Sequence, residues 1–154
     1  MGSSSEQELL ALSDEELFRG GACHVFADEL YQRLASKGFA LRRIAEGQHP
    51  SRRAHHVYVA KGDIAVDCQG TRTESSMLAD RVEFRRKNNY PPTDYKAFPC
   101  EQKSLFEVCN KVGEPEPHNC WYHRIGDHFV QECRRRARAM IASTPEKYFP
   151  SAKT

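Results

Sequence analysis

The sequence predicts an α+β fold, in which a small antiparallel sheet packs against helices in a single domain spanning residues 1–154. Apolar residues recur at helical spacing near both ends of the chain, and alternating apolar residues in its middle indicate a β-hairpin. The resulting order is helix, helix, strand, hairpin, helices. A chain of 154 residues is long enough to bury a core without metal ions or disulfides.

Composition places the chain among ordinary globular proteins. Hydrophobic residues make up 39% of the chain and charged residues 29%, and the net charge is +2. No apolar run is long enough to cross a membrane and no signal peptide begins the chain, so we expect a soluble, cytoplasmic protein. The small net charge does not indicate a nucleic-acid partner. Residues 1–6 are expected to be a flexible leader.

Two helices are expected in the N-terminal part. Ser13 followed by Glu16 has the pattern of a capping box, which predicts a helix start, and the glycines at 20–21 end this helical region. A second helix is predicted over 22–36, with Gly38 as its C-terminal breaker. Its apolar residues fall at helical spacing: Val25, Phe26, Leu30 and Leu34.

A strand over 39–44 and a hairpin follow these helices. The hairpin strands, 56–60 and 63–67, carry alternating β-branched residues and are separated by a turn at 61–62 that contains a glycine. Residue 70, a glycine, ends the second strand.

The register of the hairpin places a histidine beside an aspartate. With 61–62 as a two-residue turn, His56 lies directly opposite Asp67 on the same face, with Cβ atoms about 5 Å apart. The other face is apolar and carries Val57, Val59, Ile64 and Val66. A bulge or a three-residue turn would shift the pairing by one residue and bring His55 to this position instead.

The remainder of the chain is expected to be mainly helical. Helices are predicted over part of 71–87, at 104–112 and at 126–142, and a loop rich in proline and tyrosine over 88–99. In the last helix, arginines lie opposite an apolar stripe. The stripe consists of Phe129, Val130, Cys133, Ala137 and Ile141.

Cys23 lies where a helix begins, after two glycines and Ala22. The free N–H groups and the dipole of a first helical turn favour a thiolate and can bind an oxyanion. A nucleophilic thiol also needs a base, and the base needs a group that fixes its tautomer. We therefore expect Cys23 to act as nucleophile, His56 as its base and Asp67 as the group that orients the base.

This arrangement resembles the papain-like thiol enzymes, and especially their transglutaminase-like branch. Residues 21–23 open a helix, a strand begins at His56, and the next strand ends at Asp67, in the order of the family's Cys, His and Asp or Asn. The resemblance covers about residues 15–70. It implies a papain-like or transglutaminase-like core followed by C-terminal helices. It also implies a hydrolase or acyltransferase that acts on a protein or peptide amide through a thioester, by proteolysis, deamidation or transamidation.

Four residues near the triad are candidates for substrate binding: Gly21, Ala22, His24 and Gln69. Many papain-like enzymes carry a glutamine shortly before the nucleophile as an oxyanion donor, but Gln7 lies too far upstream. The backbone N–H of Cys23 would then serve, helped by Gln48 or Gln69. His24 is expected to be exposed or to contact the substrate.

Two other interpretations remain open. The first is a small zinc-binding domain, because one segment gathers Cys100, Cys109, His118, Cys120 and His123. Only the last two have the short spacing usual for zinc ligands, so we expect no metal and no cofactor. The second is a non-catalytic interaction module that binds a partner through the arginine-rich final helix. The sequence specifies neither the acyl acceptor nor an oligomeric state.

Overall fold

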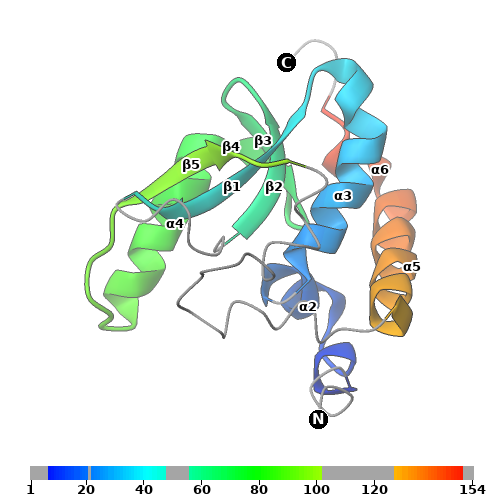
Figure 1. Cartoon of the computed structure of the whole chain (residues 1–154), viewed down its shortest axis with the longest axis horizontal. Coiled ribbons are helices and arrows are strands. Elements are labelled where there is room, and N and C mark those ends of the chain that lie inside the picture. Colours follow the sequence, from blue (N-terminus) through cyan, green and yellow to red (C-terminus); the bar gives the residue numbers. More distant parts are fainter. Residues whose placement is uncertain (1–6, 21, 48–55, 102–126, 151–154) are drawn as a thin grey trace.

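A computed structural model describes residues 7–20, 22–47, 56–101 and 127–150. The described residues form an α+β fold with a five-stranded antiparallel sheet, as the sequence predicts (Figure 1). The strands are β1 (Ala40–Glu46), β2 (His56–Lys61), β3 (Ile64–Asp67), β4 (Gly70–Thr73) and β5 (Tyr95–Pro99), in the spatial order β4-β3-β2-β1-β5. The helices are α2 (Asp14–Gly20), α3 (Cys23–Leu34), α4 (Glu74–Lys87), α5 (Asp127–Ser143) and α6 (Pro145–Tyr148).

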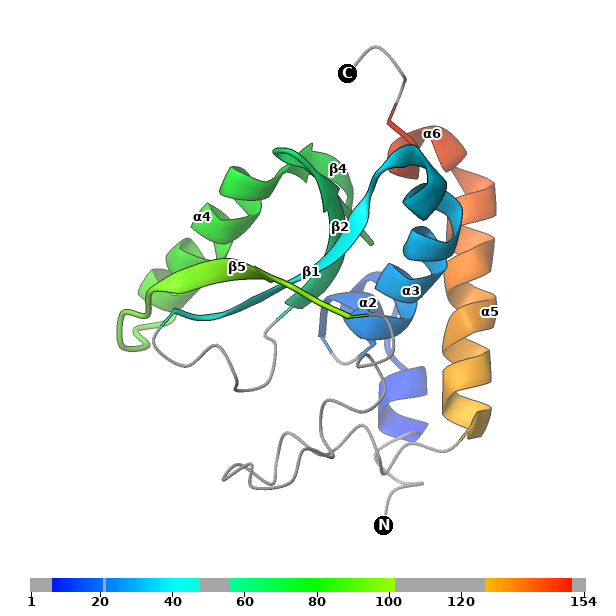
Figure 2. The same cartoon turned by 45° about the horizontal axis from the view of Figure 1, so that its top comes forward.

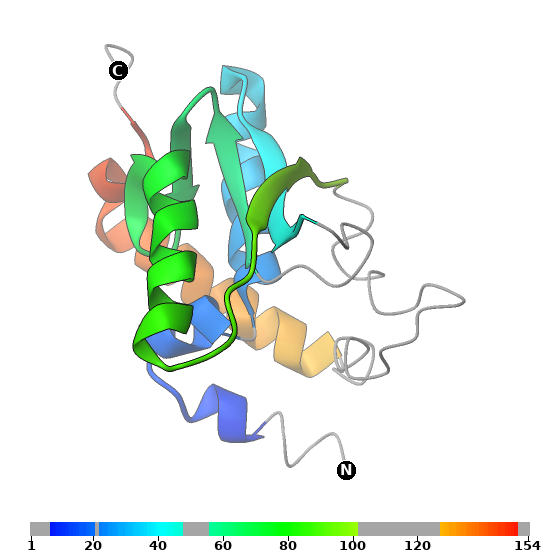
Figure 3. The same cartoon turned by 90° about the vertical axis from the view of Figure 1, so that its left-hand side faces the viewer.

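Helices cover both faces of the sheet. Helix α4 lies on one face and α3 on the other, and α5 packs behind α3 on the side away from the sheet (Figures 2 and 3). None of the helices formed by the described residues combines the length and apolar character that a membrane span requires.

The predicted starts of the N-terminal helices are confirmed. The hydroxyl of Ser13 accepts a hydrogen bond from the N–H of Glu16 at 3.2 Å, and the carboxylate of Glu16 accepts the N–H of Ser13 at 3.3 Å, which is a capping box. Helix α3 begins at Cys23 and continues through a short 3₁₀ turn, Ala35–Lys37. Gly38 ends this turn with φ +94°, a conformation that favours glycine.

The hairpin register differs from the prediction by two residues. Lys61 pairs with Ile64 and Val59 with Val66, so the turn is formed by Gly62 and Asp63. Gly62 accommodates this turn because its φ is +60°. A shift of two residues leaves each side chain on its predicted face. His56 and Asp67 are therefore diagonal rather than direct neighbours.

Two strands were not predicted from the sequence. Strand β5 falls in the segment expected to be a loop, and it pairs with the edge of β1, where Pro99 is tolerated because edge strands leave some N–H positions unpaired. Strand β4 follows a tight turn after β3 and pairs with it, so Asp67 lies opposite Gly70. Both strands are short and lack the apolar alternation on which sequence prediction relies.

The sheet separates two cores of unequal size. The larger core lies between the sheet and helices α2, α3 and α5, and it includes Leu17, Phe26, Val59, Val66, Phe129 and Cys133. The smaller core lies between the sheet and α4, and it consists of Ile44, Tyr58, Ala60, Ala65 and Met77. His56 and Asp67 alternate with the residues of the large core along their strands, so they belong to the face that α4 covers.

Helix α5 follows its predicted apolar stripe, but its arginines differ from the prediction. Phe129, Cys133, Ala137 and Ile141 are buried, whereas Val130 is half-buried. Arg134 and Arg136 are not on the open face: their side chains are only 16% and 13% exposed. They lie inside because acidic side chains of α2 and α3 pair with them.

Several predictions concern residues outside the described part of the chain. They include the leader at 1–6, the helix at 104–112, Gly21, Gln48 and His55.

Candidate active site

Packing between α2 and α3 fixes the position of Cys23. The N–H of Ala22 donates to the carbonyl of Leu17 at 3.0 Å, and the carbonyl of Ala22 accepts the N–H of Val25 at 3.0 Å. Phe18 and Phe26 pack edge to face with ring centroids 5.0 Å apart. The thiol thus emerges at the first residue of α3 with an exposure of only 4%.

His56 and Asp67 form a buried pair at the end of the sheet. Nε2 of His56 lies 2.8 Å from Oδ2 of Asp67, and each side chain is 4% exposed. The other carboxylate oxygen accepts the N–H of Gln69 at 2.9 Å, and Nη2 of Arg72 lies 3.6 Å from Oδ2. The ring of Tyr58 stacks on the imidazole with centroids 5.9 Å apart. These contacts fix both the carboxylate and the ring.

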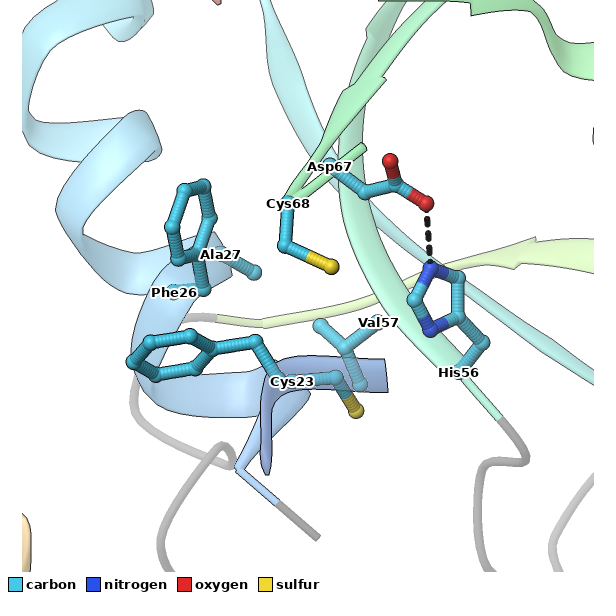
Figure 4. A pocket seen from close by; sticks show the side chains of 8 residues that line it. Cys23, Phe26, Ala27, His56, Val57, Asp67 and Cys68 are labelled. Atoms are coloured by element: carbon cyan, nitrogen blue, oxygen red, sulfur yellow. Dashed lines mark hydrogen bonds and ion pairs between the residues drawn. The ribbon is translucent and has the colours of Figure 1, made fainter. Parts of the chain in front are cut away.

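The second nitrogen of His56 is directed to the side on which Cys23 lies. Figure 4 shows Asp67 beyond one ring nitrogen and the sulfur of Cys23 on the side of the other. Nδ1 is buried and makes no hydrogen bond of normal geometry with the described part of the chain. The thiol and the ring nevertheless interact strongly enough to change the pKa of both. Such a long or bent contact is common in active sites without substrate. We refer to Cys23, His56 and Asp67 as the thiol site.

The charges of the thiol site favour an ionised pair. Burial acts to raise the pKa of Cys23, but interaction with His56 is the first of several causes that together outweigh it, and the pKa is lowered from its usual value of 9.0. The backbone N–H of Val57 and the positive charge of Arg81 lower it further. Burial acts to lower the pKa of His56, but Asp67 and Cys23 raise it overall. Burial acts to raise the pKa of Asp67, but its bond to His56, the charge of His56, the N–H of Gln69 and the charge of Arg72 together outweigh it, and the pKa is lowered.

A small pocket borders these groups. The described residues that line it are Phe18, Cys23, Phe26, Ala27, His56, Val57, Asp67 and Cys68. Its empty volume of about 140 Å³ includes open solvent, and it encloses no space large enough for a water molecule. The groups of the thiol site are therefore closely packed against one another.

Cys23 differs from the other buried cysteines. The four described cysteines, Cys23, Cys68, Cys100 and Cys133, are free thiols. Burial raises the pKa of Cys68 to about 12, with further contributions from the negative charges of Asp67 and Cys23. Burial also raises the pKa of Cys133 to about 12. Cys23 is equally buried, so its lowered pKa comes from its partners.

The candidate substrate-binding residues differ from one another in burial and in their distance from the thiol site. Ala22 is fully buried and shapes the start of α3. The side chain of Gln69 is exposed, and its backbone N–H holds Asp67. The expectation of an accessible His24 is not met, since this residue is 1% exposed and does not line the pocket. Burial and the positive charge of Arg134 lower the pKa of His24 to about 3, and Asp28 opposes this change.

Sequence reasoning missed two arginines and one backbone group near the thiol site. Arg72 reaches Asp67 from β4, a strand that was not predicted. Arg81 lies on α4, one turn after the buried Met77, and a count of helical spacing from that residue would have placed it on the inner face. The N–H of Val57 contributes through the main chain, for which side-chain patterns give no signal.

Within the described ranges, no three His, Cys, Asp or Glu side chains form a group that could hold a metal ion. Of the candidate zinc ligands only Cys100 is described, and the other four lie outside these ranges.

Comparison of the chain with models of protein families, with curated proteins and with solved structures finds no match in any of the three sets. Any assignment of function therefore rests on the residues of this chain.

Proposed function

We propose that the protein is a cysteine hydrolase or acyltransferase that acts on a protein or peptide amide through a thioester. The observation that carries this proposal is the position of His56 between two groups, with Nε2 bonded to Asp67 at 2.8 Å and Nδ1 on the side of Cys23. A carboxylate that fixes an imidazole beside a thiol is the arrangement that nucleophilic catalysis requires. Its similarity to the transglutaminase-like order of residues supports the same chemistry.

The proposed reaction has two steps. The thiolate of Cys23 attacks the amide carbonyl, so that an S–C bond forms, and collapse of the oxyanion breaks the C–N bond while His56 gives its proton to the leaving amine. Water or a second amine then attacks the thioester, and His56 accepts its proton. The S–C bond breaks and the thiolate is restored. Asp67 holds the ring and stabilises its charged form throughout.

The oxyanion has a candidate donor in the backbone N–H of Cys23, the first residue of α3. The first amides of a helix have no acceptor within the helix and can bind an oxyanion.

Alkylation of the cysteines tests the proposal. Brief treatment with iodoacetamide at near-neutral pH, followed by peptide mass spectrometry, should modify Cys23 ahead of the other cysteines, since only thiolates react rapidly. Cys68 is the internal control, because it lines the same pocket with a pKa of about 12.

Two results would count against a catalytic thiol. One is modification of Cys68 or Cys133 at the same rate as Cys23. The other is a rate at Cys23 that stays the same in His56→Ala. Cys23→Ser serves as the matched inactive variant for any later assay with peptide amides.

A further inference from the structure

Arg81 brings a positive charge to the end of the sheet that holds the thiol site. Helix α4 starts beside the hairpin turn, where the N–H of Glu74 donates to the carbonyl of Asp63 at 2.8 Å, and it contacts β3, β4 and β5. From this point Arg81 lies about 10 Å along a helix axis that rises 1.5 Å per residue. Asp67 lies about 13 Å along a strand that rises 3.3 Å per residue. Arg72 contacts both Asp67 and Asp80, the residue before Arg81, so this turn of α4 lies beside Asp67.

The inner stripe of α4 is mostly polar, and its other charged residues already have partners. The carboxylate of Glu74 accepts hydrogen bonds from Arg42 and from Tyr58, each at 2.6 Å. Arg85 donates to the carbonyl of Pro91 at 2.6 Å and to the hydroxyl of Tyr95 at 3.2 Å. Met77, between them, is buried in the smaller core.

Arg81 differs from these neighbours because no carboxylate of the described residues forms an ion pair with it. Asp67 is held by His56 and Arg72, and Asp80 pairs with Arg72. Arg81 is half-buried, and burial is the main cause that lowers its pKa. The negative charges that act on it include Cys23 and Asp67, so its guanidinium lies within electrostatic range of the reacting sulfur.

We propose that Arg81 binds a carboxylate of the acyl donor, so that preferred substrates carry an acidic side chain or a free C-terminal carboxylate close to the reacting carbonyl. This inference rests on the proposed function. A guanidinium presents two parallel N–H donors that match a carboxylate, and a partly desolvated cation without a partner favours an anionic ligand. Arg72 differs from Arg81 because it already forms ion pairs with Asp67 and Asp80, although its buried Nε makes no hydrogen bond.

Two alkylating reagents of similar size test this role without knowledge of the substrate. Iodoacetate carries a carboxylate and iodoacetamide is neutral, and each transfers its carbon to the thiolate with loss of iodide. In Arg81→Gln the rate of iodoacetate relative to iodoacetamide at Cys23 should fall about tenfold, because one nearby positive charge is removed. The ratio cancels any change in the amount of thiolate, since both reagents react with the same species. Arg81→Lys should keep most of the preference.

Arg86→Gln is the matched control. It removes the same charge from α4, at a side chain that is 70% exposed and paired with Glu83, and it should leave the ratio unchanged. Thermal unfolding checks the fold of each variant, and Arg81→Met replaces Arg81→Gln if the glutamine variant is unstable. A ratio that stays constant while both rates fall together would overturn the proposal, because Arg81 would then act only on the thiol. Absence of selective alkylation of Cys23 in the unaltered protein would instead refute the proposed function itself.

Protection from iodoacetamide distinguishes the two sources of the carboxylate. Protection by N-acetylglycine, and not by N-acetylaspartic acid α-amide, whose only carboxylate is that of the side chain, would assign a C-terminal carboxylate. The reverse result would assign an acidic side chain. Protection by neither compound would contradict the proposal, because a site that attracts iodoacetate must also hold a small carboxylate.

Discussion

Two buried polar clusters involve helix α3, and they differ in how completely their groups are paired. The first, the Glu29 cluster, consists of Asp28, Glu29, Arg134 and Arg138. Arg134 donates to Asp28 and to Glu29 at 2.9 Å each, and Arg138 donates to the two carboxylate oxygens of Glu29 at 3.1 and 3.2 Å. Arg33 adds a further bond to Glu29 at 2.9 Å. Each carboxylate is thus fully compensated, and the cluster joins α3 to α5.

The thiol site is the second cluster, and only some of its polar groups have hydrogen-bond or ion-pair partners. Asp67 has three partners, whereas Nδ1 of His56 and the thiol of Cys23 interact without a hydrogen bond of normal geometry. A buried polar group without a full set of partners destabilises a fold, so its presence indicates a role other than stability. The comparison indicates that the Glu29 cluster stabilises the fold, whereas the incomplete pairing of the thiol site is consistent with the catalytic role that we propose for it.

The largest effect is expected from the Glu29 cluster. Glu29→Ala leaves Arg134 and Arg138 without their buried partner, and the free energy of unfolding should fall by about 4 kcal/mol, as when one member of a buried ion pair is removed. Urea denaturation followed by circular dichroism measures this change. Selective alkylation of Cys23 should persist in the folded fraction. Loss of that selectivity in folded Glu29→Ala would mean that the two clusters are not independent.

His56→Ala is expected to have the reverse effect: it should change the reactivity of the thiol site more than the stability of the fold. Removal of the imidazole takes away the main groups that oppose burial of the thiolate, so alkylation of Cys23 by iodoacetamide at pH 6 should slow by at least about a hundredfold. Urea denaturation should show a smaller loss of stability than in Glu29→Ala. An equal loss of stability in both variants would show that His56 is mainly structural.

The two buried histidines should respond to acid in opposite ways. The pKa of His24 is about 3 in the folded protein, against 6.5 for an unperturbed histidine, so the unfolded chain binds a proton there as the pH falls below 6.5 while the folded chain does not. This residue should therefore remove about 2 kcal/mol of stability between pH 6.5 and 4.5. The pKa of His56 is raised, so its contribution is present below 6.5 and is lost as the pH rises through its folded pKa.

Denaturation of His24→Gln as a function of pH measures this contribution. The variant should lose less stability between pH 6.5 and 4.5 than the unaltered protein does. If the free energy of unfolding had the same pH dependence in the two proteins, His24 would not remain neutral in the folded protein.

The smallest effect is expected from Asp67→Asn. The amide keeps a partner for Nε2 but not the negative charge that stabilises the imidazolium, so the pKa of His56 should fall and that of Cys23 should rise. Alkylation at pH 6 should slow by about tenfold, and the acidic limb of the pH–rate profile should move to higher pH. A tenfold loss at every pH, without movement of that limb, would instead indicate a displaced ring.

The sequence was sufficient to predict the helix and the hairpin that carry the thiol site. The capping box at Ser13, the start of α3 at Cys23 and the face shared by His56 and Asp67 all follow from local patterns. The pair on the hairpin was predicted correctly although its register was wrong, because a shift of two residues preserves the faces of a strand.

Other features depend on contacts between distant segments and could not be predicted in this way. Strand β5 forms because the edge of β1 is open to it, and its own sequence has no strand pattern. Arg134 and Arg136 of α5 are largely buried because carboxylates of α2 and α3 lie opposite them, 100 or more positions away in the chain. His24 is buried for the same reason, since α5 covers the part of α3 that was expected to be open.

The central claim is that Cys23 is a thiolate because His56 lies beside it. Titration of the ultraviolet absorbance of the thiolate, as the difference between the unaltered protein and Cys23→Ser, measures this directly. The account predicts a thiolate at Cys23 well below the usual pKa of 9.0, and a shift of that titration to higher pH in His56→Ala. A titration of Cys23 at or above 9.0 that is the same in both backgrounds would contradict it.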